Sequence, residues 1–132
     1  MIMKIQKLLV FFGAILSLAV GHGHAQTTLV EQEGVVLTRS LSGHVDAGTP
    51  KVPVKAATVE LCSSDWKTVL ASTKTDDSGY FSLDRPAGKL FYIRVSSPGL
   101  NPFQLRVRVS KHVAHDLTID LIVATWADGL TR

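Results

Sequence analysis

Histidine and aspartate side chains that can bind a metal lie close together near the C-terminus, at His112, His115 and Asp116. Imidazole and carboxylate groups at close quarters are favoured ligands of zinc and related metals. The three residues occupy one polar stretch before a predicted strand, and no H-E-x-x-H motif is present to place two histidines on one helix face. We therefore interpret them as surface residues and predict no metal and no cofactor.

Oxygen ligands for calcium are offered by Asp76, Asp77 and Ser78, which precede Gly79. The spacing of an EF-hand loop and its closing glutamate are missing, however. Asp and Ser side chains bond to nearby backbone, and glycine adopts a positive φ freely, so these residues are typical of a tight turn. The sequence predicts a turn rather than a calcium site.

The same turn is predicted to join the two strands of a β-hairpin. Residues 69–75 alternate before the turn, and Phe81 and Leu83 point one way after it, with Tyr80 and Ser82 pointing the other. Such a hairpin presents one apolar face to a core.

Aromatic side chains that could stack on a sugar ring are a third kind of candidate. Trp66 lies in the polar stretch 63–67, whose composition suits a solvent-facing loop, and Tyr80 and Tyr92 take outward positions on predicted strands. An exposed tryptophan in a small domain often marks a contact surface, although loop aromatics also fold back to cover a core edge. We predict Trp66, Tyr80 and Tyr92 as the ligand contacts.

Catalytic motifs are missing from the sequence. Ser, His and Asp all occur, yet there is no nucleophile elbow and no glycine-rich loop for phosphate. The single cysteine, Cys62, excludes an intrachain disulfide and leaves either a buried, unreactive thiol or a disulfide to another chain. Its place at the end of an apolar alternation favours the buried thiol. The sequence favours a protein that is not an enzyme.

The candidate metal-binding, calcium-binding and aromatic residues must be positioned by short strands, each of which has one apolar face. Apolar and polar residues alternate in stretch after stretch, and no part of the chain beyond residue 26 has a useful helical period. Such faces are buried when one sheet packs on another, so about seven strands predict an antiparallel β-sandwich, with a closed barrel as the alternative. The clearest inward residues are Ala57, Val59 and Leu61; Phe91, Ile93 and Val95; Leu105, Val107 and Val109; and Leu117, Ile119 and Leu121.

Residues 1–25 have the three-part layout of a secretory signal peptide. Lys4 and Lys7 precede the apolar run 8–20, and small residues before Gln26 provide a cleavage site. The run is shorter than the roughly 20 apolar residues of a transmembrane helix, so we expect membrane contact only during export. Two of the 14 Lys and Arg residues but none of the 11 Asp and Glu lie in this segment, so cleavage lowers the formal charge from +3 to +1.

Arginine and lysine side chains would form a basic stripe if the strands that carry them were neighbours. Its members would be Arg94, Arg106, Arg108 and Lys111, and it would suit a polyanion such as nucleic acid or an acidic polysaccharide. Charges on the outer face of a strand also oppose edge-to-edge pairing. Because the mature charge is near zero, we interpret the stripe as a solvated face and predict no nucleic-acid partner.

The mature chain is predicted to be one domain over residues 39–123. Residues 26–38 are a weakly patterned lead-in that could add an edge strand through 35–37, and residues 124–132 form a tail.

Four structural motifs mark this domain: a glycine before a strand at Gly43, a Pro-Val start at Pro53, a Thr-Asp…Gly-x-Phe stretch over 75–81, and a Pro-Gly break at Pro98. Together they resemble the carboxypeptidase regulatory-like domain. The resemblance implies a transthyretin-like, Greek-key β-sandwich of seven strands without catalytic activity. Modules of that family accompany peptidases, precede outer-membrane receptors or occur alone in exported bacterial proteins, and related sandwiches bind carbohydrate.

We therefore expect an exported, periplasmic or extracellular binding or accessory module, directed at a cell-surface glycan or an envelope protein. One alternative is a structural role in envelope assembly through strand edges. The other is a small hydrolase of the hydroxyisourate type, which the transthyretin-like fold includes. That hydrolase family ends in Tyr-Arg-Gly-Ser, whereas this chain ends in Asp128-Gly129-Leu130-Thr131-Arg132, so its activity is not carried over.

Overall fold

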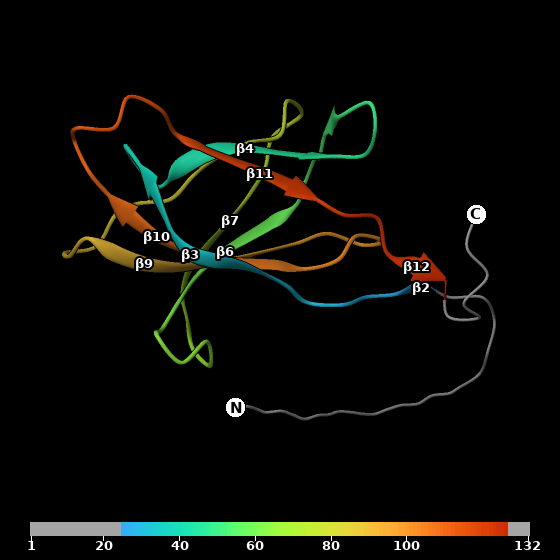
Figure 1. Ribbon diagram of the computed structural model, residues 1–132, viewed down its shortest axis with the longest axis horizontal. Helices are drawn as coiled ribbons and strands as arrows, with labels where there is room; N and C mark the ends of the chain where they lie inside the picture. The colour runs from blue at the N-terminus through green and yellow to red at the C-terminus, as the bar shows by residue number, and fades with distance from the viewer. Residues whose placement is uncertain (1–24, 127–132) are drawn as a thin grey trace. The chain divides into compact units, whose positions relative to one another are not determined.

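The computed structural model describes residues 25–126 (Figure 1). Residues 27–124 form one compact unit, and the short strands β2 (Ala25–Gln26) and β12 (Thr125–Trp126), which pair antiparallel, belong to a separate one. The predicted signal peptide lies outside the described residues except for Ala25. Residues 25–126 contain no helix of the length and apolarity that crossing a bilayer requires.

Five strands form the larger sheet, in the order β3-β10-β9-β6-β7. β3 pairs with β10 in parallel, and the other neighbours pair antiparallel. The predicted lead-in thus supplies a nine-residue edge strand. The bounds are β3 (Val30–Thr38), β6 (Thr58–Cys62), β7 (Val69–Lys74), β9 (Leu90–Ser96) and β10 (Phe103–Val109).

The smaller sheet is built on β4 (Ser42–Ala47). β11 (Leu117–Leu121) runs parallel to one edge of β4, and the short strands β5 (Val52–Pro53) and β8 (Tyr80–Ser82) pair antiparallel with β4. Gly43 lies opposite Leu117, and a Cβ at this position would overlap the backbone of that residue.

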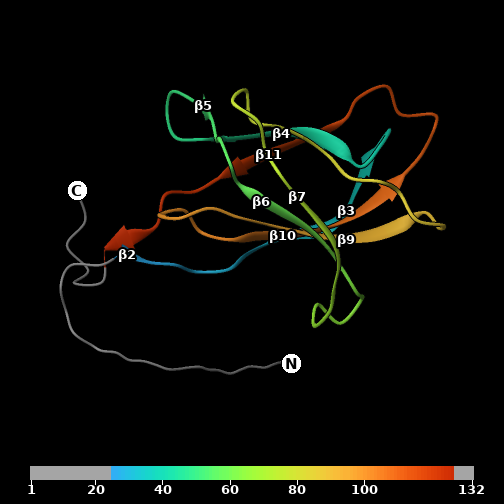
Figure 2. The same cartoon turned by 180° about the vertical axis from the view of Figure 1, so that it is seen from behind.

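The two sheets form two layers that enclose one apolar core (Figures 1 and 2). Phe81, Ile93 and Val107 are at most 1% exposed, and β9 and β11 alternate between buried and more exposed residues. The predicted all-β domain with period-two apolar faces is therefore confirmed. The buried cluster consists of Leu41, Val45, Ala47, Ala57, Val59, Leu61, Phe81, Leu83, Phe91, Ile93, Val95, Leu105, Val107, Val109, Leu117, Ile119 and Leu121.

The strand count and the purely antiparallel pairing were predicted wrongly. Residues 27–124 hold nine strands in the two sheets, and both sheets are mixed because β3–β10 and β4–β11 are parallel pairs. β5 and β8 have two and three residues, too few to show a period. Parallel and antiparallel neighbours both alternate with period two, so the pattern alone does not distinguish them.

The predicted hairpin around residues 76–79 is also wrong, although the turn itself forms. The amide of Gly79 donates to the carbonyl of Asp76 at 2.9 Å, but β7 pairs with β6 in one sheet while β8 pairs with β4 in the other. The turn therefore carries the chain from one layer to the other. Its anchor is Thr75, 5% exposed, whose hydroxyl accepts from the amide of Ala57 at 2.8 Å and donates to the carbonyl of Val54 at 2.6 Å.

Candidate functional site

The three predicted aromatic contacts lie on two different surfaces. Trp66 and Tyr92 meet edge to face on the outer side of the five-stranded sheet, with ring centroids 5.5 Å apart and planes at 88°. Tyr80 lies on β8 in the other sheet, beside His44, with ring centroids 5.3 Å apart. The structure brings together two of the three residues, and we name Trp66 and Tyr92 the aromatic pair.

The loop that carries Trp66 folds back over the sheet and is held by its own polar residues. Asp65 Oδ1 accepts hydrogen bonds from Ser63 Oγ at 2.7 Å and from the amide of Lys67 at 3.0 Å, and the hydroxyl of Ser63 lowers the pKa of Asp65. The amide of Trp66 donates to the carbonyl of Ser63, and Trp66 itself has φ +66°. A bulky residue in this region costs roughly 1–3 kcal/mol. The turn therefore holds the backbone of Trp66 in a conformation that the isolated chain would avoid.

Arg94 connects this loop to the sheet and forms an ion pair within the sheet. Glu60 on β6 lies opposite Arg94 on β9, and Arg94 Nε donates to Glu60 Oε1 at 3.0 Å. Arg94 Nη1 also donates to the carbonyl of Trp66 at 3.3 Å. The two charged side chains remain 24–28% exposed, so their free hydrogen-bonding positions face the solvent beside the aromatic pair.

The single cysteine lies under this loop rather than in the core. Cys62 is 2% exposed, yet it does not belong to the buried cluster between the layers, and its register partner is Tyr92. Directly opposite residues of a sheet share a face, which places the thiol on the outer side. Burial raises the pKa of Cys62, so the thiol stays protonated. The prediction of a buried cysteine is confirmed.

A shallow depression of about 290 Å³ continues the same surface toward the other end of β9. Thr58 and Ser96, opposite each other in the β6–β9 register, line it together with Ser97, Pro98 and Pro102. Ser96 and Tyr92 are four residues apart on one strand, a separation of roughly 13 Å. Hydroxyls, an ion pair and two aromatic rings thus follow one another along a single strip.

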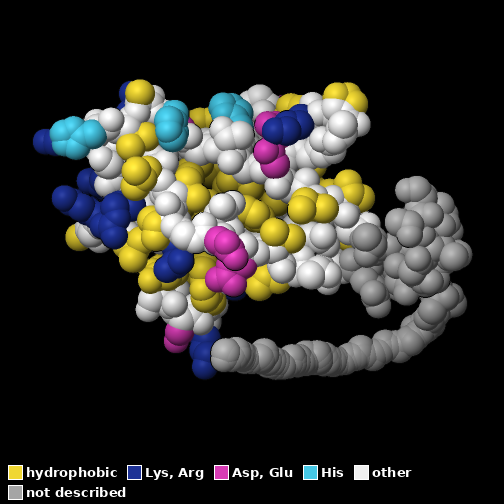
Figure 3. All heavy atoms as spheres, in the orientation of Figure 1, with side chains coloured by type: hydrophobic (Ala, Val, Ile, Leu, Met, Phe, Trp, Pro, Cys, Tyr) yellow, Lys and Arg dark blue, Asp and Glu magenta, His cyan; other side chains and the backbone are white. Residues whose placement is uncertain are grey.

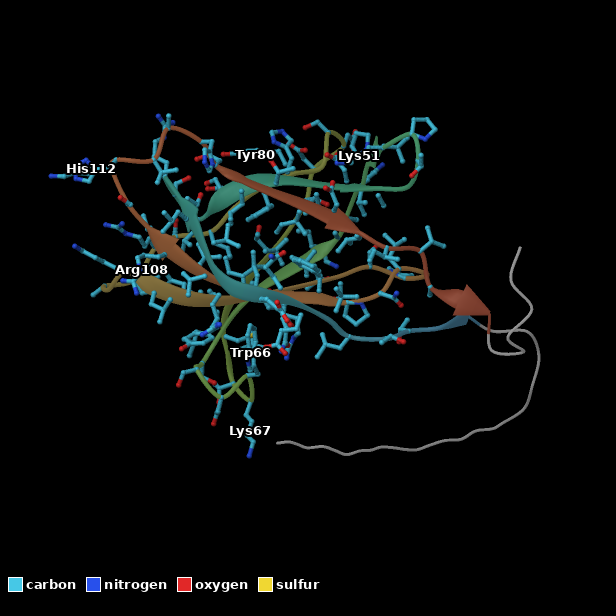
Figure 4. The ribbon with its side chains drawn as sticks, viewed as in Figure 1. Lys51, Trp66, Lys67, Tyr80, Arg108 and His112 are labelled. Carbon is cyan, nitrogen blue, oxygen red and sulfur yellow. The ribbon has the colours of Figure 1, made fainter. Side chains whose placement is uncertain are left out.

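The predicted basic stripe forms in part, because β9 and β10 are neighbours. Arg106 lies opposite Tyr92 and Arg108 opposite Leu90, while Arg94 is neutralised by Glu60. Lys111 follows β10 and is exposed. Lys and Arg side chains gather at the end of the domain where β10 ends (Figure 3), and Figure 4 places Arg108 there and Trp66 below the five-stranded sheet.

In the acidic turn, the carboxylate of Asp76 is hydrogen-bonded to residues of the same turn. Asp76 Oδ1 accepts hydrogen bonds from the hydroxyl and the amide of Ser78 at 2.8 and 2.9 Å, and from the amide of Tyr80 at 2.9 Å. The Ser78 hydroxyl is the main reason why the pKa of Asp76 is lowered. Gly79 has φ +81°. Turn geometry alone therefore accounts for these residues.

The histidine and aspartate side chains near the C-terminus, whose types could bind a metal, do not converge on one point. Asp116 Oδ1 accepts a hydrogen bond from Ser40 Oγ at 2.8 Å, His112 is exposed, and His115 Nδ1 lies 3.4 Å from the backbone oxygen of Asp116. Within residues 25–126, no group of three or more His, Cys, Asp and Glu side chains is arranged to hold a metal ion.

Glu60 is the site residue that the sequence did not reveal. It occupies an outward position of a predicted strand, but its partner Arg94 is 34 residues away. Only the register between β6 and β9 brings the two charges together, and that register depends on the whole sheet.

None of the protein-family models and none of the curated proteins with which the chain was compared matches it.

Proposed function

We propose that the chain is an exported, non-catalytic binding module of the cell envelope, and that its ligand is a glycan. The observation that carries the proposal is the aromatic pair of Trp66 and Tyr92 beside the Glu60–Arg94 ion pair on one solvent-facing surface. Sugars bind proteins by stacking their C–H faces on aromatic rings and by hydrogen bonding to polar groups at the ring edge. Export to the periplasm or the exterior rests on the signal-peptide pattern of residues 1–25.

We assign the fold to the transthyretin-like, Greek-key β-sandwiches, as a carboxypeptidase regulatory-like domain. Two mixed sheets around one core support the assignment. So do the structural roles of its motif residues, since Gly43 allows close approach of β11 and Thr75 begins the turn between the layers. Seven of the nine strands in residues 27–124 have five residues or more, in line with the seven that the family implies, and the other two, β5 and β8, are short pairings on β4.

A glycan array tests the proposed function directly. We expect the wild-type protein to bind at least one class of glycan, and Trp66→Ala to lower its apparent affinity by about tenfold, as loss of one stacking contact of roughly 1–2 kcal/mol would. Tyr80→Ala is the matched control, because Tyr80 is a half-exposed aromatic residue on the other sheet. Binding by neither wild type nor variants would exclude a glycan ligand, and an equal loss in Tyr80→Ala would exclude the aromatic pair as the site.

Envelope assembly through a strand edge is the second candidate function. The edge strand β7 carries Val69 and Leu70, which are 43% and 59% exposed, because a register shift beside Cys62 turns Val69 to the outer face. Unprotected edges of this kind pair readily with strands of other chains. The array separates the two functions, since a protein that acts only through β7 gives no glycan signal.

A further inference from the structure

Two rows of side chains cross the outer face of the five-stranded sheet next to the aromatic pair. In the first, Arg108 lies between Leu37 on β3 and Leu90 on β9. In the second, Arg106 lies between Val35 on β3 and Tyr92 on β9. Directly opposite residues share a face, so each arginine is flanked by two apolar side chains on the solvent side.

These two arginines form no ion pair, unlike three other cations of the described residues. The ion pairs within residues 25–126 are Lys51–Asp120, Lys55–Asp77 and Arg94–Glu60. Neither Arg106 nor Arg108 takes part in them, and none of their direct cross-strand neighbours is acidic. One row further along, Gln104 lies between Glu31 on β3 and Arg94 on β9, and the Arg94 guanidinium is already neutralised by Glu60. Among these rows, cations outside any ion pair are therefore found in the two that hold Arg106 and Arg108.

We infer that the glycan bound by this surface is anionic, a polysaccharide that carries carboxylate groups on its sugar rings. This inference rests on the proposed function and names the class of ligand. Cβ atoms of residues opposite each other in a sheet are about 5 Å apart, so a sugar stacked on Tyr92 has the guanidinium of Arg106 at its edge. Arg108 follows two residues later on the same face, roughly 7 Å farther along β10.

Arginine is well suited to this task. Its planar guanidinium binds a carboxylate through two parallel hydrogen bonds, and it keeps its charge at every physiological pH. Two such groups spaced along a strand can engage carboxylates on successive or alternate units of a polymer. Because Glu60 neutralises Arg94, the neighbouring part of the strip is left for the hydroxyl groups of the glycan. Thr58 and Ser96 in the depression can hydrogen-bond to the same kind of group.

A hydrated polymer fits this surface better than a lipid bilayer does. The apolar members of the two rows, Val35, Leu37 and Leu90, are 38–48% exposed, and the arginines of β10 separate Leu90 from the two residues on β3. Membrane-binding surfaces bury a continuous apolar face among the acyl chains. Here, hydroxyls and an ion pair continue the same strip beyond the aromatic pair.

Calorimetric titration with oligogalacturonate, and with the same oligomer after methyl esterification of its carboxylates, tests the inference. We expect the wild-type protein to bind the acid at least about tenfold more tightly than the ester at low salt, and the difference to shrink as salt is added. The double variant R106Q/R108Q should bind both oligomers equally. K51Q, which removes one positive charge from the turn between β4 and β5, should retain the wild-type preference.

The possible results separate this inference from the proposed function. If acid and ester bind equally well and both lose affinity in Trp66→Ala, the site binds glycans but the anionic inference is wrong. If neither oligomer nor any array glycan binds, both proposals are wrong. Binding to phosphatidylglycerol vesicles that depends on Arg106 and Arg108, without binding to either oligomer, would make the surface a membrane contact and would overturn the inference. Thermal melting of each variant verifies that it is folded.

Discussion

Alanine in place of Phe81 should lower the free energy of unfolding by about 3–5 kcal/mol. Phe81 is 1% exposed and is the largest of the fully buried side chains among the described residues. It lies on β8, a strand of three residues, and its register partner is Gly43, so no side chain directly opposite can fill the cavity. Urea denaturation followed by far-UV circular dichroism measures the change.

Tyr80→Ala is the control for this prediction. Tyr80 is the preceding residue of the same strand, but it is 38% exposed, so its loss should cost less than about 1 kcal/mol. If Phe81→Ala unfolds at the wild-type urea concentration, Phe81 does not fill the space between the two layers.

Valine in place of Thr75 should lower the free energy of unfolding by about 2–4 kcal/mol. Valine has nearly the same shape, but it leaves the amide of Ala57 and the carbonyl of Val54 without the hydroxyl that bonds to both. Each buried polar group that loses its partner costs roughly 1–3 kcal/mol. The same denaturation experiment gives the value.

Thr73→Val is the matched control for Thr75, because it makes the same chemical change two residues earlier. Thr73 lies on β7, is half-buried, and valine is at least as favourable in a strand. Its change should stay within about 1 kcal/mol. Equal effects at the two positions would mean that the Thr75 hydroxyl does not hold the turn between the layers.

Period-two alternation made the core predictable from the sequence. Phe91, Ile93 and Val95 on β9 are all at most 5% exposed, as their spacing predicts. The chemistry of the turn at Asp76 and Gly79 was also readable, since both residues act through bonds and backbone angles within four residues. The core alternation of β9 and the turn at Asp76 and Gly79, both encoded locally, were therefore predicted correctly.

Pairing between distant strands was not encoded locally. A tight turn leads to a hairpin only when both strands join the same sheet, and the Thr75 hydroxyl and the Gly43–Phe81 pairing direct them to different ones. The register shift beside Cys62 likewise turns Val69 outward against its sequence pattern. Both effects depend on neighbours that are close only in the folded chain.

In the candidate site, too, the residues could be predicted from local sequence, whereas the contacts between distant residues could not. Trp66 and Tyr92 were predicted as contacts because their types and local surroundings indicate exposure. That they meet each other and not Tyr80 depends on the return of the 63–67 loop over β9. The contribution of Glu60, and the position of Arg106 beside Tyr92, depend on strand register in the same way.

Chemical-shift mapping by nitrogen–proton NMR during titration with oligogalacturonate tests most directly whether the outer face of the five-stranded sheet is the binding surface. We predict shifts at the Trp66 indole and at the amides of Tyr92 and Arg106, with His44 and Tyr80 unchanged. Shifts confined to His44 and Tyr80, or to the free edge of β7, would contradict the account.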